Sequence, residues 1–113
     1  MADMIARFEA MLESGQDSPM LRLSLGSALV AAARIDDAIP HLEQAVARDP
    51  SYSAAWKLLG KSLLAVGAPG RALQACERGM SVAREKGDLQ AARELAVYAK
   101  RARKQLDAPD VEP

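Results

Sequence analysis

The sequence predicts an all-helical protein. Its 113 residues include 23 alanines and 14 leucines, which are good helix formers, but only nine valines and isoleucines. No stretch shows the period-two alternation bounded by turn residues that is typical of a β-hairpin. Apolar residues instead recur at helical spacing in six segments separated by glycine, proline and aspartate. We therefore expect about six helices in a single domain.

The first three segments are bounded by residues that start or stop helices. The first is expected over about residues 3–14, with an apolar stripe along one face. Ser18 and Pro19 begin the second, because serine is a good N-cap and proline suits the first helical position. A third is expected to follow Asp36 as its N-cap and to stop before Pro50.

The last three segments are marked in the same way. Their expected bounds are Ser51 or Ser53 to Gly67, Pro69 to Gly87, and Asp88 to about Leu106. Residues 107–113 are acidic, contain proline and lack apolar periodicity, so they are expected to form a disordered tail. Short connections favour packing of successive helices as antiparallel neighbours.

The chain contains an internal repeat, in which residues 53–86 follow the pattern of residues 19–52. When the two segments are laid over each other, Leu25-Gly26 falls on Leu59-Gly60, and small and large apolar residues coincide elsewhere. A glycine at this position lets two paired helices approach closely. Each unit buries only part of its apolar face alone, so neighbouring units must stack.

The repeat resembles the tetratricopeptide repeat (TPR) family. The segment Trp56-Lys-Leu-Leu59-Gly60-Lys-Ser-Leu63, followed by Ala72, matches the family pattern with leucine in place of an aromatic residue. The resemblance implies helix-turn-helix repeats stacked as a short right-handed superhelix. It also implies a division into a half repeat (1–18), two repeats (19–52 and 53–86) and a capping helix (87–106).

Four residues depart from the family pattern. Arg22 replaces a large apolar residue, Cys76 an aromatic or leucine, Gly79 a small helix former, and Arg84 the closing proline. The sixth helix is expected to start in register at Gly87, with Arg93-Glu94 where Leu-Gly belongs, and to shield the last repeat as a cap.

Composition argues against several classes of protein. One cysteine and one histidine make a poor metal site and no internal disulfide, and no catalytic constellation or cofactor motif is present. His41 is expected to face solvent, and Cys76 to be an inert buried thiol. The zero net charge disfavours a nucleic-acid binder, and the sequence shows neither a membrane span nor a signal peptide. We therefore predict a non-enzymatic cytoplasmic protein, with alanine-arginine richness suggesting a bacterial source.

The charges are unevenly distributed. Residues 1–50 carry a net charge of −4, residues 51–106 a net charge of +7, and residues 107–113 a net charge of −3. Four basic residues crowd the end of the sixth helix: Lys100, Arg101, Arg103 and Lys104. This cluster is either a solvated face, which suits a helix C-terminus, or a surface that binds a partner.

The resemblance implies that a peptide or helix of another protein binds along the concave surface, which is lined by the first helix of each repeat. The residues expected in this groove are Met20, Leu23, Ser27, Val30, Lys57, Lys61 and Leu64. Lys57 and Lys61 lie one helical turn apart and so share a face, where an acidic group beside an apolar side chain would fit. Two ordinary surface lysines are the alternative interpretation.

Two other functions stay open at this stage. The basic last helix is compatible with an accessory protein for nucleic acid, whose binding would depend steeply on salt. The uneven charge is compatible with weak self-association of the acidic half of one copy with the basic half of another, instead of a monomer.

Overall fold

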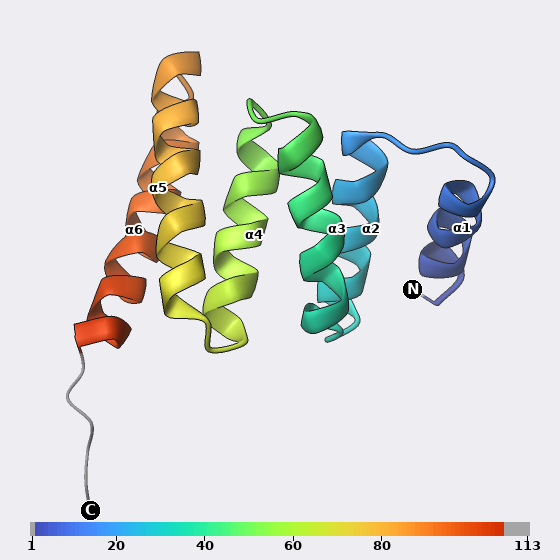
Figure 1. Ribbon diagram of the computed structural model, residues 1–113, viewed down its shortest axis with the longest axis horizontal. Coiled ribbons are helices and arrows are strands. Elements are labelled where there is room, and N and C mark those ends of the chain that lie inside the picture. Colours follow the sequence, from blue (N-terminus) through green and yellow to red (C-terminus); the bar gives the residue numbers. More distant parts are fainter. Residues whose placement is uncertain (1, 108–113) are drawn as a thin grey trace, which may run out of the picture.

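The computed structural model describes residues 2–107, which form six α-helices and no strand. The helices stand side by side in chain order, from α1 at one end to α6 at the other (Figure 1). Their bounds are α1 (Ala2–Glu13), α2 (Pro19–Ala31), α3 (Ile35–Arg48), α4 (Ser53–Ala65), α5 (Pro69–Lys86) and α6 (Leu89–Asp107). The predicted all-helical fold is confirmed.

Two of the expected helix starts are confirmed, and one is wrong. The Leu21 backbone N–H donates to the Ser18 hydroxyl at 3.1 Å, and the Ala91 N–H donates to the Asp88 carboxylate at 3.1 Å. Asp36, by contrast, is not an N-cap, because α3 begins one residue before it and Arg34 occupies the cap position without a side-chain cap. Asp36 lies in the first turn instead, where a carboxylate favours the positive end of the helix dipole.

The last helix extends slightly beyond its expected end. Asp107, expected as the first residue of the tail, is the last residue of α6. The rest of the expected tail, residues 108–113, lies outside the described residues.

The two glycines of the repeat lie where paired helices touch. A Cβ added at Gly26 would lie 2.7 Å from Leu42 Cδ2, and one added at Gly60 would lie 2.5 Å from Cys76 Sγ. Leu42 and Cys76 occupy equivalent positions in the second helices of the two repeats. The helix pairs α2–α3 and α4–α5 are therefore packed by the same glycine contact.

The register of α6 differs from the expected one by two positions. Its buried residues Ala91, Ala92, Leu95 and Ala99 have the same spacing as the buried α4 residues Ala55, Trp56, Leu59 and Leu63. Each lies two positions beyond the place that the repeat period assigns to it. Leu95-Ala96, and not Arg93-Glu94, therefore occupies the Leu-Gly position of the repeat. Arg93 is exposed and Glu94 is partly exposed.

The length of α5 explains this shift. Because Arg84 replaces the closing proline, α5 continues to Lys86 and has 18 residues, whereas α3 has 14. Gly87, with φ of +75°, then ends the helix, and a two-residue turn leads into α6. The additional turn of α5 reaches back to the preceding repeat, since Lys86 Nζ donates to the Ser51 carbonyl at 2.7 Å.

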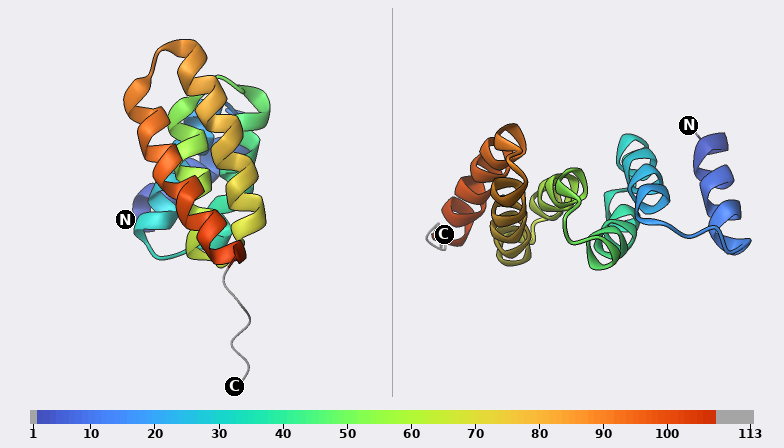
Figure 2. Two further views of the ribbon diagram at one scale, coloured as in Figure 1. Left: turned by 90° about the vertical axis from the view of Figure 1, so that its left-hand side faces the viewer. Right: turned by 90° about the horizontal axis from the view of Figure 1, so that it is seen from above.

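The stack is curved, with the first helix of each pair on the inner side. Within residues 2–107, the backbones of α2 and α4, and those of α4 and α6, approach each other closely, whereas α3 and α5 meet only through side chains such as the Glu43–Arg71 ion pair. Seen from above, the helices alternate between two rows (Figure 2). We call the side formed by α2, α4 and α6 the concave face. Among residues 2–107, no helix combines the length and apolarity needed to span a membrane.

Candidate protein-binding surface

The α2 part of the concave face is mainly apolar. Of the four residues expected there, Met20 and Ser27 are exposed, and Leu23 and Val30 are half-buried against the core. Met20 is 68 % exposed, the largest value among the bulky apolar side chains of residues 2–107. These side chains form an apolar surface that contains a single hydroxyl group.

The α4 part of the concave face differs from the expected one, because one of its two predicted lysines is paired with a carboxylate. Lys57 Nζ lies 2.7 Å from Glu94 Oε2 of α6, and this pair keeps the pKa of the Glu94 carboxyl below its usual value. Lys61 is exposed and forms no ion pair within residues 2–107, and Leu64 beside it is half-buried. Of the two lysines that the sequence suggested, Lys61 alone thus has no ion-pair partner among the residues that the structure describes.

Sequence reasoning missed Glu94 because a constant repeat period placed it at an interior position. In the observed register it corresponds to Leu58, on the side of α6 that faces α4. The shift of α6 could have been anticipated from the missing proline at position 84 and the glycine at position 87.

An apolar cleft of about 510 Å³ opens between α1 and α2. Met4 and Phe8 line it from α1, and Leu23, Ser27 and Ala31 line it from α2. Two of the predicted groove residues, Leu23 and Ser27, thus face α1. Met4 and Phe8 belong to the apolar stripe predicted for this helix, and Met4 is 49 % exposed.

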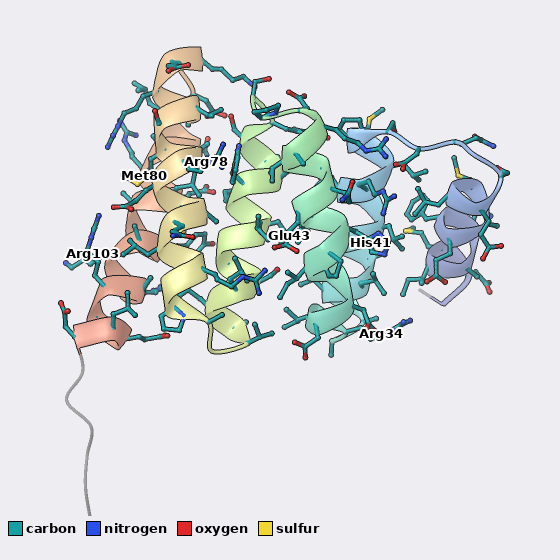
Figure 3. The ribbon with its side chains drawn as sticks, viewed as in Figure 1. Arg34, His41, Glu43, Arg78, Met80 and Arg103 are labelled. Carbon is teal, nitrogen blue, oxygen red and sulfur yellow. The ribbon has the colours of Figure 1, made fainter. Side chains whose placement is uncertain are left out.

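A second cleft of about 370 Å³ lies on the opposite, convex side between α3 and α5. Trp56, Leu59 and Leu63 form its floor. Figure 3 shows Glu43 on its α3 side and Arg78 on its α5 side. The charged groups on both sides of this cleft have partners within the protein. Glu43 pairs with Arg71, and the Arg78 guanidinium lies 5.2 Å from the centre of the Trp56 ring.

His41 lies in a polar cluster and does not simply face solvent as expected. Arg22 donates to His41 Nδ1 at 3.0 Å and forms two hydrogen bonds to Asp17, at 2.8 and 2.9 Å. Arg48 adds a contact of 2.9 Å to the same carboxylate. Burial and the neighbouring Arg22 charge lower the pKa of His41, so the imidazole accepts this hydrogen bond in its neutral form.

Cys76 is fully buried, as the sequence predicts. Burial, with a smaller contribution from Glu77, raises the pKa of its thiol to about 11. A thiol with so high a pKa is a poor nucleophile at neutral pH, because the thiolate is the reactive form. No group of three or more potential metal ligands occurs among residues 2–107.

Comparison with known proteins identifies the family. A family model described as tetratricopeptide repeat matches residues 23–80, which is more than half of the chain. The chain belongs to the tetratricopeptide repeat family. The TPR match spans parts of both repeats seen in the sequence.

Bacterial relatives cover most of this TPR chain. A TPR repeat-containing protein of Pseudomonas aeruginosa is 42 % identical over 98 residues, which is 87 % of this chain and 93 % of that protein. A protein of Bordetella parapertussis with a known solution structure is 41 % identical and has a TM-score of 0.74, with 91 % of each chain covered. The crystal structure of a TPR domain protein of Salinibacter ruber is 26 % identical, with a TM-score of 0.70 over 76 % of this chain and 97 % of that one.

Membership of the family has a general consequence. The TPR is a non-enzymatic repeat fold in general, and TPR domains generally mediate protein–protein interaction. The concave face described above is therefore the candidate surface for a partner.

Proposed function

We propose that this protein is a small non-enzymatic adaptor that binds a peptide or helix of a partner protein on its concave face. The observation that carries the proposal is that Lys61, which has no ion-pair partner within residues 2–107, lies beside apolar surface. Lys61 projects from α4 next to Leu64, and the apolar cleft between α1 and α2 lies one repeat away. A segment with an acidic group and an apolar side chain would fit both features.

The proposal gives Cys76 and His41 no catalytic role, for chemical reasons. Cys76 is held as a buried neutral thiol, and the Nδ1 atom of His41 accepts a hydrogen bond from Arg22. Neither residue is available as a nucleophile or a general base. We further propose a cytoplasmic location, as the sequence predicts for a chain with one unpaired cysteine. Fractionation of the source cell, with detection of the native protein, would test the location.

The test of groove binding uses Lys61→Glu with Lys104→Glu as the matched control. Both lysines are exposed, so either reversal changes the net charge equally and leaves the core intact. A peptide selected from a display library on the wild-type chain should bind Lys61→Glu at least several-fold more weakly, and Lys104→Glu with little change. Lys57→Glu is a poorer test, because it would place two carboxylates together beside Glu94.

The location of the bound peptide gives a second measurement. Backbone amide shifts in an NMR titration should change most at Leu23, Ser27, Lys61 and Leu64. Shifts confined to α3 and α5, or equal affinities of the wild type and Lys61→Glu, would contradict binding on the concave face.

The basic end of α6 supports a second function less well. Arg103 pairs with Glu77 at 3.2 Å, and the Arg101 guanidinium lies 5.8 Å from the centre of the Tyr98 ring. Two of the four basic groups thus have contacts within the protein. Nucleic-acid binding would still predict a steep loss of affinity with salt, and its elimination by reversing Lys100 and Lys104.

A further inference from the structure

Within residues 2–107, each end of the stack lacks the helix that would complete a pair: a first helix at the α1 end and a second helix at the α6 end. In a complete pair, the first helix packs against the second through the glycine contact described above. At one end, α6 has the sequence position and burial pattern of a first helix, but no second helix follows it within residues 2–107. At the other end, α1 corresponds to a second helix, since Phe8 lies one repeat period before Leu42, and no first helix precedes it in this part of the chain.

A cleft lies at each of these two ends. At the α6 end, a shallow cleft of about 240 Å³ is lined by Arg84, Leu89, Ala92, Arg93 and Ala96. One of these residues, Ala96, occupies the position of Gly60 in the repeat. We call this surface the α6 end face.

The cleft between α1 and α2 is the corresponding surface at the other end. Met4 and Phe8, which line it, lie one repeat period before Ala38 and Leu42. In the first complete pair those α3 residues are fully buried, and Leu42 packs on Gly26. We call the surface formed by Met4, Phe8 and the facing side of α2 the α1 end face.

We propose that the α6 end face of one copy binds the α1 end face of a second copy, so that α6 and the second copy's α1 complete one repeat between them. Phe8 would face the small Ala96 as Leu42 faces Gly26, with the two helices farther apart than α2 and α3 because Ala96 carries a Cβ. This contact goes beyond the adaptor function, and a second copy would compete with a bound peptide for the cleft between α1 and α2.

Charge supports a second copy as the occupant. Around the α1 end, α1 carries three acidic residues and one basic residue: Asp3, Glu9, Glu13 and Arg7. By contrast α6 carries five basic and two acidic residues: Arg93, Lys100, Arg101, Arg103, Lys104, Glu94 and Asp107. If Ala96 packs on Phe8 in an antiparallel pair, Lys100 comes to the level of Asp3. Association should therefore weaken with salt.

The proposed contact joins two different surfaces, so it repeats from copy to copy and does not close at a dimer by twofold symmetry. Sedimentation velocity of the purified full chain, over a concentration series at low salt, should show a mass that rises progressively. Met4→Glu blocks the α1 end face and Ala96→Glu blocks the α6 end face, so each variant should be monomeric. Leu106→Glu is the control, since Leu106 is as exposed as Met4 but lies beyond the end of the proposed contact.

An equimolar mixture of Met4→Glu and Ala96→Glu gives the sharpest result. Each variant retains one intact end face, and the two faces are complementary, so the mixture should form a dimer and nothing larger. Lys100→Glu and Asp3→Lys should each weaken association of the wild-type faces several-fold, and the double reversal should restore it. Circular dichroism would verify that each variant is folded, and Met4→Glu stays informative if Ala96→Glu is not.

Three outcomes would overturn the proposal: a monomeric mass at every concentration, association that survives both Met4→Glu and Ala96→Glu, or a mixture that stays monomeric. The adaptor function is tested separately by Lys61→Glu. Lys61 belongs to neither end face, so that variant should associate like the wild type whether or not it binds peptide.

Discussion

At the scale of single residues, the two repeats fill one pair of equivalent positions with different side chains. Trp56 and Ala75 occupy the positions that Arg22 and His41 occupy one repeat earlier. In the second repeat, a large indole lies beside a methyl group, and its N–H donates to the Pro50 carbonyl at 2.8 Å. In the first, the Arg22 guanidinium spans the space between Asp17 and His41. The departure at Arg22 is thus compensated by its partners and does not weaken the assignment to the family.

Gly79 has no room for a side chain. A Cβ there would lie 2.7 Å from Trp56 Cβ and 3.0 Å from Leu95 Cδ1, so α4, α5 and α6 meet at this residue. Gly79→Ala should therefore destabilise the protein by about 1–3 kcal/mol through overpacking, although alanine favours helices. Urea denaturation would measure it. Gly70→Ala in the same helix is the control, since nothing lies within 4 Å of its added Cβ, and an equal loss in both variants would contradict the packing explanation.

Ala33 is held in a backbone conformation that suits glycine. Its φ is +61°, and Gly67, at the equivalent turn one repeat later, has a φ of +77°. The left-handed conformation costs a residue with a side chain about 1–2 kcal/mol. Glycine avoids this cost, but its more flexible unfolded state offsets part of the stability gained. Ala33→Gly should therefore raise stability by about 0.5–1 kcal/mol.

Thermal unfolding measures this difference, and Gly67→Ala is the reciprocal variant. It should lower stability by a similar amount, because nothing within 4 Å obstructs the added Cβ and only the backbone is strained. If Ala33→Gly lowered the melting temperature, the strain assigned to this turn would be wrong.

At the scale of helices, the sequence predicts the elements well but their relative positions only partly. Composition and punctuation identify all six helices, and the internal repeat identifies the pairs packed at Gly26 and Gly60. The register of α6 was not predicted, because a constant repeat length was assumed although Arg84 lacks the helix-stopping chemistry of proline.

The same reason limits the prediction of the candidate site. Lys57 and Lys61 are placed on one face by helical periodicity alone. Their charge state depends on Glu94, which belongs to another helix and is brought near by tertiary packing. The division of the chain into a half repeat, two repeats and a cap remains a prediction.

The helices should differ in local stability. Within residues 2–107, α1 packs against α2 alone, whereas α4 packs against α2, α3, α5 and α6. In a stacked repeat protein, an end helix with one neighbour opens more readily than a central one. Hydrogen exchange of the dilute monomer should therefore be fastest for the amides of α1 and slowest for those of α4. Equal protection of both helices would show that the chain opens only as a whole.

At the scale of the whole molecule, the two ends of the stack differ both in net charge and in the type of helix that ends them. Within residues 2–107, the acidic half ends in α1, which has no first helix before it, and the basic half ends in α6, which has no second helix after it. The concave face lies between these ends, and we propose that it includes the exposed Lys61, which forms no ion pair within residues 2–107. The proposed peptide site and the α1 end face share the cleft between α1 and α2, so Met4 substitutions address both, whereas Lys61 and Ala96 each belong to one surface only.

Global stability should depend on pH through His41, the only histidine of the chain. Burial and Arg22 lower its pKa in the folded state, against the opposite effect of Glu9, Asp17 and Asp37. Below the ordinary histidine pKa of about 6.5 the unfolded chain therefore binds more protons than the folded one, so stability is fully present above this pH and falls as the solution is acidified.

Urea denaturation at several pH values between about 7.5 and 5 would measure this loss, because carboxylates titrate mainly below that range. His41→Ala should flatten the profile, and alanine at this position has a precedent in Ala75 of the second repeat. Arg22→Gln tests the cause, since it removes the positive charge beside the ring and should reduce the pH dependence without abolishing the part due to burial. A profile of the same slope in the wild type and His41→Ala would mean that another group is responsible, because the imidazole alone distinguishes the two chains.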